Sequence, residues 1–474
     1  MCHHSLKNFV EIVIALTLVF ITLAAVDADA QVTCFGDPTC IQPETGHPVG
    51  MFGTPNIEVV SHLPLPGIRF SHADIEIEQE ISRPFAYIAQ RFGYSGFYAI
   101  SLEDPARPEV LYRWIIDDPD LHQGTGCVDI KYAKDNGRYY VAVSCQFGQG
   151  GPDADLGAIV FDVTGLPDAS TVRKVAEIRL PNMVGGIHNI FTYKHSNGRA
   201  LLAATTQSED VYLYDFGQLG RGITEPVSRI PVPSPRAERS RQWHDMFMGY
   251  LPDAEQDRFY GAGTGGFHVF DVTDVESPRL LTTLTGIPGV MDGHTFTPTP
   301  DGRYALGMPE PTYQHSPVRF FDLRPPGSED RVPNVITGSG IGAWIAKVGG
   351  ATHNHEIRWP YVFISAQDDG LQIIDITDPT RPFTVGYYQT RVGPMLYGDG
   401  ERPPQATTGN IYDGAWGIDV RNADGLIVVS DFNSGFWAFR LLGFLDWNGN
   451  NWGMPNISSA QMWDEGPVKE EQLW

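Results

Sequence analysis

Five histidines lie at equivalent positions, each near the start of one of several similar strand-like segments. They are His72, His188, His244, His294 and His355. The chain has only 14 histidines, and turns are capped equally well by Ser, Thr or Asn, so five imidazoles in one column favour a shared role. Converging neutral imidazoles are the commonest protein ligands of Zn, Cu, Fe and Mn. The sequence therefore predicts a transition-metal site, with the identity of the metal open among these four.

The neighbours of the column are candidates for orienting the ligands. They are Asp245, Asp292, His353 and Glu356. A metal-bound His usually donates its second ring nitrogen to a carboxylate or carbonyl, and these residues are adjacent in sequence. Adjacent strand residues point to opposite faces, however, so exposed loop positions are the alternative. Each histidine alone also has a simpler explanation, a hydrogen bond to a turn.

A short apolar strand that ends in Asp or a substitute recurs seven times and would position the column. The copies begin at Gly96, Ala158, Val211, Phe267, Val318, Leu371 and Phe436. They are spaced by roughly 50 to 65 residues, which suits four-stranded propeller blades. The composition agrees, because 51 Gly and 36 Pro favour many short strands and tight turns over long helices.

Each repeat predicts an inner strand, two central strands and an outer strand after an Asp-Pro turn. The inner strand carries the histidine column; blade 2 has Cys127 or its neighbour there, and blade 7 has Trp416. The last repeat lacks an outer strand, and the segment 56–65 can supply it. Joining the two chain ends in one blade removes the exposed sheet edge. The fold class is therefore all-β, a seven-bladed β-propeller closed by an N-terminal strand in its last blade.

These repeats resemble the LVIVD-repeat family. The best matches are Leu371-Gln372-Ile373-Ile374-Asp375-Ile376-Thr377-Asp378-Pro379 and Phe267-His268-Val269-Phe270-Asp271-Val272-Thr273-Asp274. The resemblance covers about residues 56–440 and implies a propeller, while propellers host many chemistries. Ser101 and Arg440 replace the closing Asp, so the first and last blades depart from the pattern.

The stretch His353-Asn354-His355-Glu356-Ile357-Arg358-Trp359-Pro360 is similar to one in selenium-binding proteins and bacterial methanethiol oxidases. Those are propellers with His-bound copper, so the resemblance implies a metal-dependent oxidase. The chain lacks counterparts of the Cys-rich motifs of that family, which puts thiol oxidation in doubt. Carotenoid-cleaving oxygenases, with iron held by four histidines inside seven blades, are similar in architecture only.

The N-terminus is typical of a secretion signal, with Lys7, an apolar run over 12–26 and Ala28-Asp29-Ala30. Cleavage after Ala30 would send the chain to the periplasm or outside the cell without a membrane span; an uncleaved anchor is the alternative. The predicted organisation is a signal peptide (1–30), an N-terminal loop segment (31–55), the propeller (56–445) and a C-terminal tail (446–474).

Five cysteines are present, and Cys2 would leave with the signal. Four remain, an even number that suits disulfides in an oxidising compartment. Cys34 pairs with Cys40 in this prediction, and Cys127 pairs with Cys145 because both lie equally far from the turn at Asn136. A free thiol or soft metal ligand at Cys127 is the competing interpretation.

The charge balance excludes one class of partner. With 57 acidic and 33 basic residues the net charge is -24, which disfavours nucleic acid. We therefore expect an exported metalloprotein that acts as an oxidoreductase on a small molecule. The alternatives are a non-catalytic propeller that binds a protein or glycan, and a hydrolase that uses metal-bound water. The sequence does not specify the oligomeric state.

Overall fold

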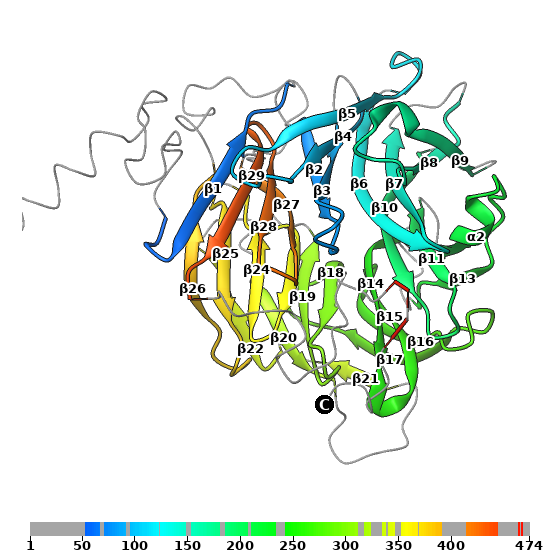
Figure 1. Ribbon diagram of the computed structural model, residues 1–474. Coiled ribbons are helices and arrows are strands. Elements are labelled where there is room, and N and C mark those ends of the chain that lie inside the picture. The colour runs from blue at the N-terminus through cyan, green and yellow to red at the C-terminus, as the bar shows by residue number, and fades with distance from the viewer. Residues whose placement is uncertain are drawn as a thin grey trace, which may run out of the picture. The chain divides into compact units, whose positions relative to one another are not determined.

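Seven sheets of the computed structural model follow one another along the chain, six with four antiparallel strands and one with a fifth strand added (Figure 1). The structure describes residues 53–66, 71–91, 95–122, 124–147, 153–180, 185–206, 210–233, 242–310, 317–323, 334–337, 340–346, 352–367, 369–390, 414–443, 463–464 and 466–467. They belong to one compact unit, Gly53–Arg391 with Thr408–Trp474. This unit is the predicted seven-bladed β-propeller, and its sheets are numbered blades 1 to 7 in chain order.

The first three blades use consecutive strands. Blade 1 has β2 (His72–Ile77), β3 (Phe85–Gln90), β4 (Gly96–Ser101) and β5 (Glu109–Ile115); blade 2 has β6 (Gly124–Asp135), β7 (Arg138–Phe147), β8 (Leu156–Asp162) and β9 (Arg173–Arg179); blade 3 has β10 (Ile187–Lys194), β11 (Ala200–Thr206), β12 (Asp210–Asp215) and β13 (Ser228–Pro231). Short helical turns η1 (Ala169–Thr171), α2 (Phe216–Leu219) and η2 (Pro252–Ala254) lie in connections.

The remaining blades follow the same plan. Blade 4 has β14 (Trp243–Leu251), β15 (Gln256–Gly263), β16 (Gly266–Asp271) and β17 (Arg279–Thr285); blade 5 has β18 (Asp292–Pro298), β19 (Tyr304–Glu310), β20 (Val318–Asp322) and β22 (Gly342–Trp344); blade 6 has β23 (His355–Arg358), β24 (Tyr361–Ser365), β25 (Leu371–Asp375) and β26 (Phe383–Tyr388); blade 7 has β27 (Ala415–Val420), β28 (Ile427–Asp431), β29 (Gly435–Leu441) and β1 (Ile57–Leu63).

The N-terminal strand completes the last blade, as the repeat pattern predicts. β1 pairs antiparallel with β29, with Ile57 opposite Leu441 and Leu63 opposite Phe436. The inner strand β27 in turn contacts β2 of blade 1. Because blade 7 is built from both parts of the chain, no open sheet edge remains between blades 7 and 1.

Packing between blades explains why the repeated strands are apolar on both faces. Every residue of β8 is buried, because each blade lies between two others. Aromatic pairs join neighbouring blades: Phe191 and Phe247 lie 5.0 Å apart between blades 3 and 4, and Phe267 and Phe296 lie 4.9 Å apart between blades 4 and 5. This packing holds the inner strands at a fixed depth.

Blade 4 departs from the four-strand prediction. A fifth strand, β21 (Asn334–Thr337), pairs parallel with the outer strand β17. It comes from the long connection between β20 and β22 of blade 5. Four residues are too short to stand out in the sequence pattern, so the sequence does not predict this strand.

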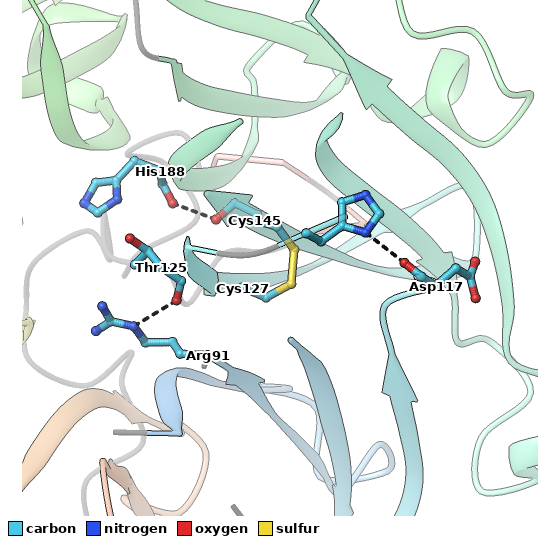
Figure 2. Close-up of a disulfide and its surroundings, with 8 residues drawn as sticks. Arg91, Asp117, Thr125, Cys127, Cys145 and His188 are labelled. Atoms are coloured by element: carbon cyan, nitrogen blue, oxygen red, sulfur yellow. Dashed lines mark hydrogen bonds between the residues drawn. A yellow bond between two sulfur atoms is a disulfide. The ribbon is translucent and has the colours of Figure 1, made fainter. Parts of the chain in front are cut away.

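The predicted disulfide between Cys127 and Cys145 is confirmed. The two residues lie opposite each other on β6 and β7, with Cα atoms 3.9 Å apart. The turn of this hairpin has Asn136 at φ 49° and Gly137 at φ 72°, the positive values that a type I′ turn requires. Arg91 and His188 lie to one side of the disulfide and Asp117 to the other (Figure 2).

Several sequence predictions lie outside the described residues. They are the signal peptide, the Cys34–Cys40 pair and most of the C-terminal tail. Of the tail, Trp463 packs on Tyr132, with ring centroids 5.9 Å apart, and is 5% exposed. Within the described ranges, no helix is long and apolar enough to cross a membrane.

Candidate functional site

A β-bulge interrupts the inner strand of blades 1 to 5 and 7 near its start. In blade 4 the pairing with β15 jumps between Trp243 and Asp245, so His244 is the extra residue. In blade 5 it jumps between Gly293 and Thr295, which leaves His294 unpaired in the same way. A bulge re-aims a side chain out of the regular alternation. The bulged residues therefore occupy equivalent positions on the inner strands of successive blades.

A shared hydrogen bond identifies the bulged residue in blades 3, 6 and 7. The residue after the bulge donates its backbone N–H to a hydroxyl of the next strand: Asn189 to Thr205 at 2.8 Å, Asn354 to Ser365 at 3.0 Å and Gly417 to Ser430 at 3.0 Å. The seven bulged residues, named here the bulge ring, are Ala73, Val128, His188, His244, His294, His353 and Trp416.

Four imidazoles and one indole of the bulge ring contact one another in sequence. The centroids of successive rings from His188 through His244 and His294 to His353 lie 4.6, 4.2 and 4.8 Å apart. His353 then stacks on Trp416 with centroids 3.4 Å apart. Three of the predicted ligands are thus brought together, and the fourth imidazole is His353, which the sequence placed beside the column.

His355 and His72 lie outside this arc, so the column differs from the predicted one in blades 6 and 1. His355 is 5% exposed and shares a strand face with Ile357, which packs into the core between blades 5 and 6. His72 is 1% exposed, and its Nδ1 lies 3.3 Å from the backbone oxygen of Phe432. The bulge shifts the register by one residue, which strand alternation alone does not reveal.

Each histidine of the arc has an oxygen at its Nδ1. His188 lies 2.9 Å from Oε1 of Gln146, His244 lies 3.1 Å from the backbone oxygen of His294, His294 lies 2.6 Å from Oγ1 of Thr295, and His353 lies 3.0 Å from the backbone oxygen of Trp416. A carbonyl oxygen can only accept, so His244 and His353 carry their proton on Nδ1 and their lone pair on Nε2. This is the tautomer in which Nε2 can bind a metal.

The Nε2 atoms of His188 and His244 face each other at 3.1 Å. Two nitrogens bound to one ion at about 2.0–2.1 Å are roughly 3 Å apart when the angle at the metal is about 100°. Across the described residues, no group of three or more His, Cys, Asp or Glu side chains is arranged to hold a metal ion. A third ligand would therefore require a rotation of His294 or His353.

Burial keeps the imidazole of His353 neutral. Its pKa lies well below the usual value, first because burial removes it from water, although its hydrogen bond to the Trp416 carbonyl opposes this effect. His244, Arg91 and His188 lower the pKa further, because a positive charge on any of these neighbours disfavours a second one on His353. The Arg91 guanidinium lies over Trp416, 5.0 Å from the ring centroid. A neutral imidazole is the form that binds a metal.

The carboxylates predicted to orient the histidines have other partners. Asp245 accepts the backbone N–H of Met246 at 2.7 Å, and Glu356 accepts a hydrogen bond from Arg358 at 2.6 Å. Asp292 is the first residue of β18, and the oxygens found at Nδ1 of the arc histidines come from other residues. The orienting atoms at Nδ1 are instead an amide, a hydroxyl and two backbone carbonyls. Backbone oxygens leave no residue-type signal, so sequence reasoning could not find them.

A layer of buried and half-buried polar residues lies one residue beyond the bulge ring. Its members are Asp74, Asp129, Asn189, Asp245, Thr295 and Asn354. Lys131 connects three carboxylates here: its Nζ donates to Asp74 and to Asp129, the latter at 2.7 Å, and lies 3.8 Å from Glu76. Burial and the facing carboxylates shift the pKa of Asp74 well upward, whereas Lys131 itself is held protonated.

Asp419, which lies beside Arg358, makes the stability of the fold depend on pH. Burial and the adjacent Glu356 charge raise the pKa of Asp419 to about 7, against the opposing effect of Arg358. The folded chain therefore keeps a proton that the unfolded chain releases near pH 4. Stability from this group is complete below about pH 4 and is lost as the pH rises through about 7.

We expect Asp419→Asn to flatten this dependence. Since Asn does not titrate, the fall in unfolding free energy between about pH 5 and 8 should become smaller in the variant. Urea denaturation at several pH values in this range measures the slope of unfolding free energy against pH. The slope should not vanish, because the pKa values of Asp74 and Glu76 are also raised. Identical slopes for the two proteins would contradict the assignment.

Comparison with known proteins gives a family match and distant structural similarities. The LVIVD repeat profile matches residues 350–390, and no curated protein matches the sequence. Among solved structures, Chaetomium thermophilum Raptor is 10% identical with a TM-score of 0.49; the match covers 81% of this chain but only 29% of that one. The WD40 β-propeller domain of Doa1 is 9% identical with a TM-score of 0.47, covering 80% and 95%.

These similarities say nothing about activity, and nothing in them supports a relation to selenium-binding proteins. The LVIVD match falls on blade 6, the blade that contributes His353 to the bulge ring. The chain is therefore a seven-bladed β-propeller in which one blade matches the LVIVD repeat.

Proposed function

We propose that the chain is an exported metalloprotein that binds one transition-metal ion at the bulge ring. The Nε2 atoms of His188 and His244 are the first two ligands, and His294 and His353 follow in the arc. The 3.1 Å approach of two Nε2 atoms carries this proposal. His244 donates from Nδ1 to a carbonyl, and His188 does so to Oε1 of Gln146, so both Nε2 atoms carry lone pairs. Two facing lone pairs repel unless a cation lies between them.

The chemistry of the donors suits Cu, Fe, Mn or Zn, because imidazole nitrogen binds all four. Such an ion, when bound, supplies redox or Lewis-acid chemistry to a small molecule in the channel. Burial holds the His353 imidazole neutral, and the oxygens at Nδ1 fix the orientation of all four imidazoles. We therefore propose that the protein is an oxidoreductase. In a hydrolase, by contrast, the bound metal would not change its oxidation state.

Export is part of the proposal. The buried disulfide Cys127–Cys145 supports it, since such bonds persist in the periplasm and outside the cell. The apolar N-terminal run followed by Ala28-Asp29-Ala30 agrees with this location.

A non-catalytic propeller is the second candidate. If the Gln146 amide is turned by 180°, its NH₂ donates to Nδ1 of His188, and the two histidines share an ordinary N–H···N hydrogen bond. The histidines would then form a hydrogen-bonded plug, and loops on the rigid propeller would bind a protein or glycan. The absence of a three-ligand cluster among the described side chains is compatible with this candidate.

Metal reconstitution separates the two candidates. The mature chain is dialysed against Cu, Fe, Mn or Zn separately, and metal content is measured beside His244→Ala and the control His62→Ala. His62 lies in β1 and stacks on Trp437 outside the bulge ring. We expect one equivalent of bound metal in the wild type and in His62→Ala, and loss of this metal in His244→Ala. Less than about a tenth of an equivalent of every metal in the wild type would favour the plug.

A further inference from the structure

The two imidazoles that face each other at Nε2 differ in what lies at their Nδ1 atoms. Nδ1 of His244 lies 3.1 Å from the backbone oxygen of His294, which can only accept, so the proton of His244 is fixed on Nδ1. Nδ1 of His188 lies 2.9 Å from the side-chain amide of Gln146. An amide accepts through its oxygen or donates through its NH₂, according to its orientation. His188 can therefore take either tautomer, whereas that of His244 is fixed.

The strand that carries Gln146 is held firmly against His188. Cys145, the preceding residue, is buried and forms the disulfide with Cys127. Ser144 lies one residue earlier, and its Oγ donates to the backbone oxygen of His188 at 2.7 Å. Figure 2 shows Cys145 beside His188. The backbone of Gln146 is thus fixed, and its amide stays within reach of the Nδ1 atom.

The amide group of Gln146 can turn although its backbone is fixed. The side chain is half-buried, and the residue opposite it on β6 is Gly126, which has no side chain. Among the described residues, the amide hydrogen-bonds to His188 alone. Half a turn about the last side-chain bond exchanges the oxygen for the NH₂ without moving the backbone. Within the described chain, the imidazole is therefore the contact that decides the orientation of the amide.

Each orientation of the amide gives a different state of the histidine pair. With the oxygen toward Nδ1, His188 donates from Nδ1, and its Nε2 lone pair faces that of His244 across 3.1 Å. Two facing lone pairs repel, and a cation between them removes the repulsion. With the NH₂ toward Nδ1, the proton of His188 lies on Nε2 and is donated to Nε2 of His244. The ring keeps one proton and no charge in both states.

We propose that Gln146 sets the tautomer of His188 and thereby switches the pair between a metal-binding state and a hydrogen-bonded state. In the metal-free chain the NH₂ of Gln146 donates and the two histidines bond to each other. When a metal is bound, the amide is turned and its oxygen accepts from Nδ1. Gln146 is a positioning residue, because it acts through His188. The inference deepens the proposed function: the tautomer follows from hydrogen bonds alone, whereas the effect on metal binding rests on that function.

NMR of the metal-free chain tests the tautomer. With isotope-labelled histidine at about pH 8, where ordinary histidines are neutral, two-bond proton–nitrogen correlations report which ring nitrogen carries the proton. The signal that disappears in His188→Ala is the signal of His188. We expect its proton on Nε2 in the wild type and in Gln146→Leu, because Nε2 then donates to His244. We expect it on Nδ1 in Gln146→Glu, because a carboxylate only accepts.

Zn²⁺ titration of the same samples tests the effect on metal binding. Competition against a chelator should show that Gln146→Leu binds about 10–100-fold more weakly than the wild type, because the group that orients a ligating imidazole is lost. Gln146→Glu should bind Zn²⁺ at least as tightly as the wild type, since its His188 already has the ligand tautomer.

Gln256→Leu is the matched control for both measurements. Gln256 is also half-buried, and its Oε1 accepts from Arg258 at 3.0 Å. It is the first residue of β15 and pairs with Leu251, at the end of blade 4 far from the bulge at His244. Gln256→Leu should therefore match the wild type in the tautomer of His188 and in its affinity for Zn²⁺.

The two measurements can fail separately. The same His188 tautomer in Gln146→Leu and Gln146→Glu would overturn the role of Gln146, and equal Zn²⁺ affinities in these two variants would overturn the switch. A tautomer that follows the substitution, in a wild type that takes up none of Zn, Cu, Fe or Mn, would refute the metal proposal while leaving the role of Gln146 in place.

Discussion

Substituting His353 with Leu is expected to weaken metal binding by at least about 100-fold, whereas the same substitution at His355 should leave it unchanged. His353 belongs to the imidazole arc and stacks on Trp416. His355 lies two residues further on and faces the core with Ile357. The two variants carry the same change in side chain, so only its position differs. Competition against a chelator of known affinity measures the loss.

The His355→Leu control also has an expected effect on stability. Both ring nitrogens of His355 are buried without a hydrogen-bond partner, and burial lowers its pKa to about 3. An apolar side chain of similar volume removes that unsatisfied polar group, so the variant should unfold at no lower urea concentration than the wild type. Equal metal loss in both variants would show that the assignment to His353 is mistaken.

The second large effect concerns Lys131. Lys131→Met is expected to lower the free energy of unfolding by about 3–5 kcal/mol, because it leaves buried carboxylates without their cation. Asp74 and Asp129 both accept from its Nζ, and their side chains are 4% and 7% exposed. Met keeps most of the apolar stem, so the loss reports on the charge. Urea denaturation near pH 7 measures it.

A surface lysine provides the control for this experiment. Lys174 pairs with Glu177 at 2.5 Å, but its side chain is 36% exposed, and Lys174→Met should cost at most about 1 kcal/mol. The deficit of Lys131→Met should also shrink toward pH 4, where the stranded carboxylates take up protons. Similar losses for the two variants at pH 7 would mean that Lys131 is not the centre of a buried ionic network.

The blades were predictable because each one repeats the same physical requirement. A strand such as β8 or β25 lies between two other blades and must be apolar on both faces, and that run with its closing Asp is visible in the sequence. Closure by β1 followed from the missing outer strand of the seventh repeat. Both inferences depend on side-chain type alone, which a sequence shows directly.

The membership of the bulge ring was harder to predict, because a bulge inserts one residue that no apolar pattern marks. The predicted column coincides with the ring at His188, His244, His294 and Trp416, and at Val128 as the neighbour of Cys127. Two positions were displaced, from Ala73 to His72 and from His353 to His355. A signal existed: Asp, Asn or Thr follows the bulged residue in six blades, as in His244-Asp245 and His353-Asn354. His355-Glu356 lacks that signal. The Lys131 network links residues from different strands, and no local pattern predicts such contacts.

The pairing of β1 with β29 has a consequence for how the molecule is made. Synthesis proceeds from the N-terminus, so β1 is among the first propeller strands to emerge and has no partner until almost the whole ring has been produced. Such distant pairing is slow to form, since a very long stretch of polypeptide must be brought together at its ends. We therefore expect pairing of β1 with β29 to come late in folding, and a chain that stalls before β29 is synthesised to leave β1 unpaired and prone to aggregation.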